Sequence, residues 1–559
     1  MRILLIVSAF NSLSQRIFVD LKELGHSPAV IYAASENEMQ KKIQDFNPDV
    51  IVCPYLKKKL PKTIWENKPT FIIHPGIMGD RGAYSLDWAI LEKKQIWGVT
   101  IIKANDILDG GDIFASEEFA MRSAPKASIY RHEVATAASK ALKNALKNLE
   151  NKDFTPKKLD YADKEIKGRA HPFMTQNERK IEWQKETTDE IIKKIYASDS
   201  FPGVLDEFFG VECYLFGAQK EEFLRGNPKE ILAKRDGAVC VGTIDGALWI
   251  SHMKEKEKMI KLPAAFVLKE KLLGVRENRI PLILEEKRET FKEIFFEEKD
   301  SVGYLYFEFH NGAMSAHQCV RLKYAIESVI ERDIKVLVLM GGEDFFCNGI
   351  HLNIMEDSKK KAEDGWSNLH SMNELARTII FSTNIITVSA LRGGAGAGGV
   401  SLAGACDFVV AKDGTVLNPH YMNLGLFGSE YWTYTLPKKI GAEKADELMQ
   451  KCMPIGAQEA KRIKLVDEVF DENIDKFTKE LQEFCSELAK SEDYHDLLLK
   501  KREKLKNDEL EKSIDSYKEE ELKKSYDSFY DENSLFHKLR YEFVHKLCQT
   551  QTPKRFKDA

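Results

Sequence analysis

The chain has 559 residues, and its 83 lysines and arginines stand against 88 aspartates and glutamates, which gives a formal net charge of −5 at pH 7. This slight acidic excess argues against a nucleic-acid-binding protein, which normally carries a basic excess. A chain of this length is too long for a single hydrophobic core, so several domains are expected.

The nine cysteines include no C-x-x-C pair, and most of them lie in apolar runs. The sequence therefore indicates neither a metal site nor a disulfide framework, and reduced thiols are typical of the cytosol. The first residues form a short apolar run without the features of a signal peptide, and no later stretch approaches the roughly eighteen apolar residues of a membrane span. We expect a soluble, cytoplasmic protein that binds neither nucleic acid nor membranes.

Apolar runs alternate with a helical pattern through the first part of the chain. This pattern predicts an amphipathic helix at residues 15–24 and strands at residues 2–7, 29–33, 50–53 and 70–74. Such alternation is typical of a doubly wound α/β domain with a parallel sheet, which binds its ligand at the carboxyl ends of the strands. The loop after the first strand lacks G-x-G-x-x-G, so a dinucleotide ligand is disfavoured.

Two polar residues of this region are candidates for chemistry. His74 ends a predicted buried strand, and Asp109 lies further along in the string L-D-G-G. A histidine and a carboxylate at adjacent strand ends can relay a proton while an acyl carbon moves between two nucleophiles. A strand-end histidine that precedes a proline can also be purely structural, and its position alone leaves both interpretations open.

The residues around this pair resemble the folate-dependent formyltransferases. The matching pieces are His74, Arg81-Gly82, Trp88-Ala89-Ile90, Gly98-Val99-Thr100 and Leu108-Asp109-Gly110-Gly111. The resemblance implies a formyltransferase-like domain over residues 1–170, with His74 and Asp109 as the catalytic pair and 10-formyl-tetrahydrofolate as the formyl donor. The candidate substrate-binding residues of this domain are Ser14, Gln15, Arg81 and Gly82. The family's asparagine is Ile72 here, so another group must contact the formyl oxygen.

Residues 171–280 resemble the small β-barrel that follows the catalytic domain of the tRNA formyltransferases. The matching pieces are His171-Pro172-Phe173-Met174, Lys180-Ile181-Glu182-Trp183 and residues 195–203. Short β-type runs at residues 211–216, 238–243 and 247–252 fit such a barrel. A barrel that merely packs two domains together is an equally good interpretation. The charged stretch 285–298 is expected to link this part to the next domain.

Two strand-and-turn units follow in the second half of the chain. A predicted strand at 336–340 leads into a glycine-containing turn at 341–350, and a strand at 385–388 leads into closely spaced glycines and a small-residue helix that ends near Cys406. Two such turns can each aim one amide at the same carbonyl oxygen and so form an oxyanion hole. A small-residue helix can also simply pack tightly against a neighbour.

Together the two units resemble the crotonase (enoyl-CoA hydratase/isomerase) superfamily over residues 285–490. The resemblance implies that the amides of Ile350 and Gly398 form the oxyanion hole. The positions of the two hydratase glutamates are Ser401 and His420 here. Without two carboxylates to hold and split a water molecule, a hydratase loses its general acid and base, so hydration is not expected.

The remaining candidates are side chains for proton transfer and for phosphate binding. Tyr421 and Glu430 are favoured over His420 as proton carriers, because a desolvated glutamate has a raised pKa and can transfer a proton near neutral pH. Arg131 and Arg392 are candidates for binding the phosphates of coenzyme A, since the planar guanidinium offers paired donors. Helices are predicted at residues 315–331 and 363–381, and residues 491–559 are expected to form a charged, helical extension.

A formyltransferase-like part followed by a crotonase-like part resembles a family of [NiFe] hydrogenase maturation proteins. The resemblance implies a two-step synthesis of carbon monoxide: formyl transfer from 10-formyl-tetrahydrofolate to coenzyme A, then decarbonylation of formyl-CoA. Other hydrogenase maturation proteins would be its partners. Two alternatives stay open at this point, namely a formyl-CoA or formyl-folate hydrolase that releases formate, and a non-catalytic scaffold.

Overall fold

The computed structural model describes residues 1–547 and 552–556. The chain divides into two compact units. The first unit comprises residues 1–278 and 288–291 with the described C-terminal residues 552–556, and the second comprises 279–287 and 292–547. The first unit contains most of the predicted domains 1–170 and 171–280, and the boundaries within each unit stay predictions. Among the described residues, no helix is both long and apolar enough to cross a membrane.

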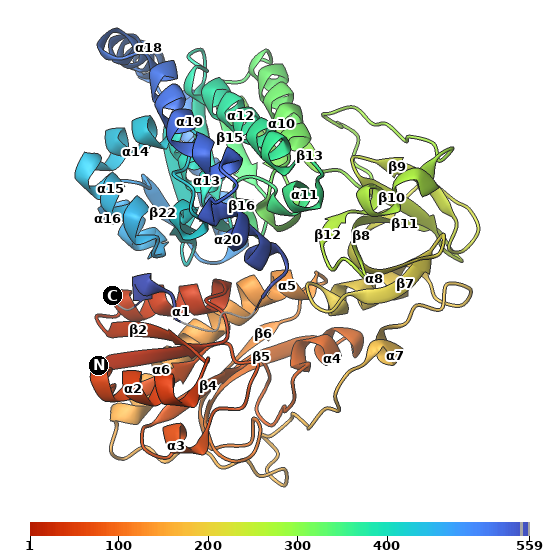
Figure 1. Cartoon of the computed structure of the whole chain (residues 1–559), viewed down its shortest axis with the longest axis vertical. Helices are drawn as coiled ribbons and strands as arrows, with labels where there is room; N and C mark the ends of the chain where they lie inside the picture. Colours follow the sequence, from red (N-terminus) through yellow and green to blue (C-terminus); the bar gives the residue numbers. More distant parts are fainter. Residues whose placement is uncertain (548–551, 557–559) are drawn as a thin grey trace. The chain divides into compact units, whose positions relative to one another are not determined.

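The first unit begins with a six-stranded sheet in the order β2-β1-β3-β4-β5-β6 (Figure 1, red to orange). Its strands are β1 (Arg2–Val7), β2 (Ser27–Tyr32), β3 (Val50–Cys53), β4 (Thr70–His74), β5 (Ile96–Lys103) and β6 (Ile113–Ala120). The predicted strands are confirmed, but the sheet is parallel only through β4. Strand β5 runs antiparallel to β4 although α4 lies between them, and β6 runs antiparallel to β5 after a short connection; the early alternation did not indicate either direction.

Helices pack against this sheet. They are α1 (Ser12–Glu23), α2 (Glu36–Phe46), α3 (Lys62–Trp65), α4 (Ser85–Leu91), α5 (Lys126–Ile129), the π-helical turn η1 (Tyr130–Val134) and α6 (Ala135–Glu150). Helix α1 begins three residues before the predicted start at Gln15. The reason is local, since the Asn11 side chain accepts a hydrogen bond from the Ser14 amide and so caps the helix.

The second part of the first unit is the small barrel-like sheet (Figure 1, yellow to green). Its elements are α7 (Gln176–Arg179), α8 (Thr188–Ser198), β7 (Val204–Phe208), β8 (Val211–Glu221), β9 (Ile231–Arg235), β10 (Ala238–Gly242), β11 (Ala247–Glu255), β12 (Lys261–Pro263), α9 (Ala264–Leu268) and η2 (Lys269–Leu272). A buried ion network ties it to α4, because Asp87 contacts Arg179 at 2.6 Å and Lys126 at 2.9 Å. All these residues belong to one compact body.

The second unit contains two sheets, in the orders β13-β14-β15-β17-β19-β22 and β16-β18-β20-β21. The strands of the larger sheet are β13 (Ile294–Lys299), β14 (Val302–Phe307), β15 (Val336–Gly341), β17 (Ile386–Leu391), β19 (Phe408–Lys412) and β22 (Glu468–Phe470). The smaller sheet consists of β16 (Phe345–Cys347), β18 (Gly394–Gly396), β20 (Val416–Asn418) and β21 (Ile455–Gly456). Strand β16 pairs with β18, so the two predicted glycine-containing turns lie side by side.

The stretch 285–298, which was expected to link the barrel to the next domain, also contributes a strand to the second unit. Ile294–Lys299 is an edge strand of the larger sheet and pairs antiparallel with β14. Glu293 just before it is buried and accepts hydrogen bonds from Gln318 and Arg321. In β13 Ile294 and Phe296 are buried while residues 297–299 are exposed, so only the first half of the strand faces the core, and the charged residues around it concealed this short apolar part.

Helices complete the second unit. The first group is η3 (His310–Gly312), α10 (Ala316–Ile330), α11 (Leu352–Asp357), α12 (Lys361–Ile380), α13 (Gly398–Gly404), η4 (Tyr421–Leu424), α14 (Trp432–Ile440), α15 (Ala442–Lys451) and α16 (Ala457–Arg462). The C-terminal group is α17 (Ile474–Lys490), α18 (Tyr494–Glu511), α19 (Ile514–Tyr530) and α20 (Leu535–Val544), and a short turn, η5 (Lys554–Phe556), belongs to the first unit. The helices predicted at 315–331 and 363–381 are confirmed as α10 and α12.

The highly charged C-terminal helices are part of the core rather than a solvated tail. Ile514 and Phe529 of α19 and Phe536 of α20 are fully buried in the main hydrophobic cluster of the second unit. Burying such side chains stabilises the docked helices by roughly 1.5–3 kcal/mol each. This docking brings α19 against the elements that carry Tyr421 and Glu430.

Candidate functional sites

His74 lies at the carboxyl end of β4, between two aspartates. Its Nε2 atom is 2.8 Å from Asp80 Oδ2, and its Nδ1 atom is 3.6 Å from Asp109 Oδ2. The histidine is only 4% exposed. Burial by itself lowers the pKa of His74, but the hydrogen bond to Asp80 and the negative charge of Asp109 outweigh it, so the net pKa is raised. The structure thus brings the predicted pair together.

The close partner of His74 is a residue that the sequence analysis did not single out. Asp80 is 1% exposed, and its second oxygen lies 3.2 Å from His171 Nε2. The only signal in the sequence was its place in the string G-D-R-G. Gly76 makes room for this pair, since a Cβ atom there would lie 2.4 Å from Asp80 Oδ2 and 2.5 Å from His74 Nε2. The glycine of His-Pro-Gly is therefore required sterically.

Arg81 and Gly82 hold the loop that carries Asp109. Arg81 Nε donates to the Leu108 carbonyl at 2.9 Å, and the Gly82 amide donates to Asp109 Oδ2 at 3.3 Å. Asp109 has a φ of 49°, a left-handed conformation that aspartate tolerates better than most residues. Ile72 precedes His74 by two positions and so shares its face of β4, where it presents an aliphatic side chain in place of the family's asparagine.

The other candidates of the first unit lie near the start of α1 and in η1. Ser14 is fully buried, and its hydroxyl donates to Asn11 Oδ1 at 2.9 Å. Gln15 Nε2 donates to the Phe10 carbonyl at 3.0 Å, and Arg131 is half-buried in η1. The polar groups of Ser14 and Gln15, both in the first turn of α1, therefore support the loop 8–11, which leads from β1 into α1.

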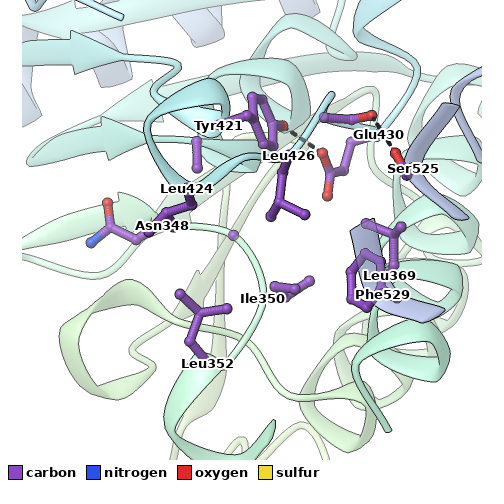
Figure 2. A pocket seen from close by; sticks show the side chains of 13 residues that line it. Asn348, Ile350, Leu352, Leu369, Tyr421, Leu424, Leu426, Glu430, Ser525 and Phe529 are labelled. Atoms are coloured by element: carbon purple, nitrogen blue, oxygen red, sulfur yellow. Dashed lines mark hydrogen bonds between the residues drawn. The ribbon is translucent and has the colours of Figure 1, made fainter. Parts of the chain in front are cut away.

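The second unit holds a largely apolar pocket (Figure 2). The pocket is lined by Asn348, Gly349, Ile350, Leu352, Leu369, Ala397, Tyr421, Leu424, Leu426, Gly428, Glu430, Ser525 and Phe529. Figure 2 shows Tyr421 and Glu430 turned toward one another at one end of the pocket. Leu369 and Phe529 form a side wall, and Ile350 and Leu352 lie at the end away from Tyr421. Concave apolar sites with a few polar groups are typical of small-molecule binding.

Of the two predicted oxyanion-hole residues, Ile350 lines this pocket and Gly398 follows the lining residue Ala397. Gly398 begins α13, where a first-turn amide has no acceptor within its own helix. A Cβ atom on Gly349 would lie 3.3 Å from the Gly398 nitrogen, so the two turns nearly touch. Their closeness follows from the pairing of β16 with β18.

Glu430 and Tyr421 form the polar end of the pocket. The Tyr421 hydroxyl donates to Glu430 Oε2 at 2.5 Å, and Glu430 is 1% exposed. Burial raises the pKa of Glu430 to about 7, while the hydrogen bond from Tyr421 limits the rise. Burial, and then the charge of Glu430, raise the pKa of Tyr421 well above its usual range. A carboxyl group that titrates near neutral pH can both take up and release a proton there.

The residues at the hydratase glutamate positions play other parts. The Ser401 hydroxyl lies 3.4 Å from the Tyr421 hydroxyl, and His420 Nδ1 lies 2.7 Å from the Asn418 carbonyl oxygen. His420 is not among the residues that line the pocket. Lys438, the ordinary ion-pair partner that Glu430 could have had, instead contacts Asp508.

Arg392 lies directly after β17 and is engaged within the fold. Its guanidinium donates to the carbonyl oxygens of Met340 and Gly341 at 3.1 and 2.9 Å, and it lies 3.5 Å from Glu308. It therefore braces the end of β15, at the start of the first glycine-containing turn. The contacts to backbone carbonyls use donors that a phosphate would otherwise take.

Several residues of the second site escaped the sequence analysis. Asn373 of α12 accepts hydrogen bonds from the Glu430 amide at 2.8 Å and from the Ser429 hydroxyl at 2.7 Å, and Ser525 and Phe529 of α19 line the pocket. These residues lie roughly 60 to 100 positions from Glu430 on separate helices, so no local sequence motif indicates them. Only the packing of α12 and α19 brings them to the turn.

Comparison with known proteins agrees with this division of the chain. The family models described as formyl transferase, as formyl transferase C-terminal domain and as enoyl-CoA hydratase/isomerase match residues 2–146, 174–268 and 298–547. The predicted fold class and the predicted order of a formyltransferase part and a crotonase-like part are thereby confirmed.

Two relatives match along nearly the whole chain. The hydrogenase maturation factor HoxX of Bradyrhizobium diazoefficiens is 37% identical over 555 residues, which cover 99% of this chain and 96% of the relative. The crystal structure of HypX from Aquifex aeolicus in complex with tetrahydrofolic acid is similar with a TM-score of 0.96 and 41% identity, covering 100% of this chain and 98% of that one. A methionyl-tRNA formyltransferase of Campylobacter hominis is 28% identical over 41% of this chain and 73% of its own length.

The packing of Gly398 against Glu430 gives a testable prediction. A methyl group at Gly398 would lie 2.9–3.1 Å from the carboxyl atoms of Glu430, whereas one at Gly404 in the same helix would meet no atom closer than 3.7 Å. We expect Gly398→Ala to displace the Glu430 side chain from Tyr421 and to lower the free energy of unfolding by about 1–3 kcal/mol. Urea unfolding and a crystal structure of the variant measure both effects.

Gly404→Ala is the matched control and should leave the stability unchanged or slightly higher, because alanine favours the helix over glycine. If both variants unfold alike and Gly398→Ala keeps the Tyr421–Glu430 hydrogen bond, Gly398 does not define the position of Glu430.

Proposed function

The chain belongs to the HoxX/HypX family of hydrogenase maturation factors, and we propose that it makes carbon monoxide in two steps. In the first unit the formyl group of 10-formyl-tetrahydrofolate passes to the thiol of coenzyme A. In the second unit formyl-CoA is cleaved into carbon monoxide and coenzyme A. Other [NiFe] hydrogenase maturation proteins would receive the product.

One observation carries the proposal for the second step. A crotonase-like pocket holds a buried Glu430–Tyr421 pair, while Ser401 and His420 stand where the hydratase glutamates would be. The site therefore combines candidate oxyanion donors with a single proton carrier and has no second carboxylate in its lining to hold a water molecule. This combination suits loss of carbon monoxide better than hydration or hydrolysis.

In the first step His74 serves as the proton carrier. It takes the proton of the thiol as the sulfur attacks the formyl carbon, and it returns that proton to the folate nitrogen as the carbon–nitrogen bond breaks. Asp80 and Asp109 on its two ring nitrogens stabilise the protonated imidazole during the transfer. Arg81 and Gly82 keep Asp109 in place through the loop contacts.

Two observations support a formyl-folate substrate for the first unit, one from its residues and one from a relative. The His74 pair lies at the carboxyl end of β4, the edge where sheets of this type bind ligands. The relative from Aquifex aeolicus was crystallised with tetrahydrofolic acid. Arg131 stays a candidate for the coenzyme A phosphates, whereas the carbonyl contacts of Arg392 assign it a supporting part in the second unit.

In the second step the amides of Ile350 and Gly398 would hold the formyl oxygen, and Glu430 would move the proton. The ionised Glu430 accepts the formyl hydrogen as a proton, the carbon–sulfur bond breaks, carbon monoxide departs, and Glu430 delivers the same proton to the sulfur. Atoms and charges balance without water or an oxidant. Tyr421 steadies the carboxylate through its hydroxyl and keeps one oxygen of Glu430 aimed along the pocket.

An assay with the purified protein tests this proposal against its alternatives. The protein is supplied with 10-formyl-tetrahydrofolate and coenzyme A, and any carbon monoxide is trapped by reduced haem while formate is measured in parallel. Carbon monoxide in proportion to the folate consumed supports the two-step synthesis. Formate alone supports a hydrolase, and no turnover supports a scaffold; either result overturns the proposal.

The first-unit pair gives a prediction for formyl transfer. His74→Ala and Asp109→Asn should each slow the coenzyme A-dependent release of tetrahydrofolate by about 10²–10⁴-fold, the range typical of lost acid–base catalysis. His26→Ala is a control, because His26 contacts the chain's first residue at the amino ends of the parallel strands, opposite the edge that carries His74. Parent-like release from both variants would show that the pair does not relay the proton.

The second-unit pair gives a separate prediction. Glu430→Gln and Tyr421→Phe should let formyl-CoA accumulate while tetrahydrofolate is still released, because only the second step loses its proton carrier. Chromatography of the thioesters together with the haem assay measures both products. Tyr434→Phe is the control, since Tyr434 is a buried tyrosine of the same unit whose hydroxyl bonds to Asp508 instead. Undiminished carbon monoxide from Glu430→Gln and Tyr421→Phe contradicts the assignment.

The pKa of Glu430 sets the expected pH dependence. Glu430 must be ionised to accept the formyl proton, and burial raises its pKa to about 7. Below that pH the carboxyl is protonated, so kcat/KM for carbon monoxide release from added formyl-CoA should rise through an acid limb near pH 7 and then level off. A profile that is flat between pH 5 and 8, roughly the range in which such a group titrates, would mean that another residue moves the proton.

A further inference from the structure

The short segment 428–433, which carries Glu430, has an unusual backbone. Glu430 and Tyr431 have φ values of 63° and 58°, in the left-handed region that residues other than glycine rarely adopt. Gly428 before them has a φ of 95°. Consecutive residues of this kind persist only where surrounding contacts enforce them. Something outside the segment must therefore hold this turn in place.

Two helices supply the contacts that hold the turn. From α12, Asn373 Oδ1 accepts hydrogen bonds from the Glu430 amide and the Ser429 hydroxyl. From α19, Glu521 accepts hydrogen bonds from the Tyr431 amide at 3.0 Å, from the Thr433 amide at 2.8 Å and from the Thr433 hydroxyl at 2.7 Å. The amides on both sides of the Glu430 side chain are thus fixed from distant parts of the chain.

Placing Glu521 in this contact costs folding free energy. Its side chain is fully buried, and desolvating a carboxylate is expensive even when it accepts hydrogen bonds. Burial, with the nearby charge of Glu430 acting in the same direction, raises the pKa of Glu521 to about 8. Helix α14 has no side-chain cap of its own at Tyr431, where a serine or asparagine would satisfy an amide at lower cost.

Docking of the C-terminal helices does not by itself explain why a glutamate is buried at position 521. Asp508 of α18 already bonds to the Tyr434 hydroxyl and to Lys438 of α14. Asp515 of α19 bonds to the Tyr431 hydroxyl and pairs with Arg377. Those contacts reach side chains, whereas both amide contacts of Glu521 reach the backbone of the turn itself. Glu521 does not line the pocket.

We propose that Glu521 is a positioning residue for Glu430, which holds the left-handed turn from α19 so that the Glu430 carboxyl meets Tyr421 and Gly398. The C-terminal helices are then part of the second active site of their own unit. The effect of Glu521 on catalysis rests on the proposed decarbonylation. Its effect on the Tyr421–Glu430 hydrogen bond can be tested without it.

The test compares Glu521→Gln with Asp508→Asn. A glutamine side chain has nearly the same volume as the glutamate, but it offers one acceptor oxygen and one amino group. Therefore either the Tyr431 amide, or the amide and hydroxyl of Thr433, would face a donor instead of an acceptor. Asp508→Asn is the matched control, because it weakens a carboxylate contact between the same C-terminal helices and α14 without touching the turn. Crystal structures, thermal unfolding and steady-state kinetics with added formyl-CoA are recorded for both variants and the parent.

The expected result has a structural and a kinetic part. In Glu521→Gln the Tyr421–Glu430 hydrogen bond of 2.5 Å should be lost, and kcat for carbon monoxide release should fall by about 10²-fold with KM nearly unchanged, as for a displaced catalytic group. Asp508→Asn should keep the hydrogen bond and the parent kcat. A purely structural role predicts equal effects of the two variants on unfolding and no selective loss of kcat, and that outcome would overturn the proposal.

Two further arms keep the result decisive. If Glu521→Gln does not fold, Thr433→Val removes only the hydroxyl contact to Glu521 and should weaken the Tyr421–Glu430 contact in the same direction; an unchanged contact would overturn the proposal. If the parent releases no carbon monoxide, the proposed function fails, yet the crystal structures still decide whether Glu521 positions Glu430. The two failures are therefore distinguishable.

Discussion

The second site depends on keeping a carboxyl group out of water. Glu430 lies in an apolar pocket with the Tyr421 hydroxyl as its close side-chain partner, and burial raises its pKa to about 7. A carboxyl that was paired with a lysine would stay ionised and hold its charge too firmly to pass a proton on. The surrounding structure meets this requirement, since Lys438 contacts Asp508 instead.

The first site treats its titratable group in the opposite way. His74 is equally buried, but it lies between Asp80 and Asp109, so the protonated form is favoured and its pKa is raised. In the first unit the two aspartates offset the free-energy cost of burying the charge of His74. In the second unit the cost of burying the charge of Glu430 is offset only in part, by the hydroxyl of Tyr421. In the proposed mechanism the two carriers have different tasks: His74 holds a proton between two nucleophiles, and Glu430 releases one to a sulfur.

The proposed chemistry would require only a few substitutions in the crotonase-like scaffold. The strand pairing that brings Ile350 and Gly398 together is kept, and the hydratase carboxylate positions are occupied by Ser401 and His420. The proposed proton carrier, Glu430, lies in the turn before α14, and contacts from α12 and α19 hold that turn in its left-handed conformation. Folds of this kind host different reactions because the scaffold and the reacting side chains vary independently.

The sequence by itself determined the elements and the residues that sit at their ends. Strands β3 and β4 and the paired glycine turns could be predicted, since periodicity and turn composition are local properties of the chain. His74, Asp109, Tyr421 and Glu430 became candidates through their chemistry and through the resemblance to known families, and their roles stay predictions. Only the tertiary structure decided which partners these residues meet. Within their own segments Asp80, Asn373 and Glu521 are ordinary polar residues. They contact the sites because helix docking and loop closure bring distant segments to within hydrogen-bond distance. The antiparallel β5 and β6 and the edge strand β13 were also missed, because pairing direction depends on how the chain returns to the sheet and not on the composition of the strand.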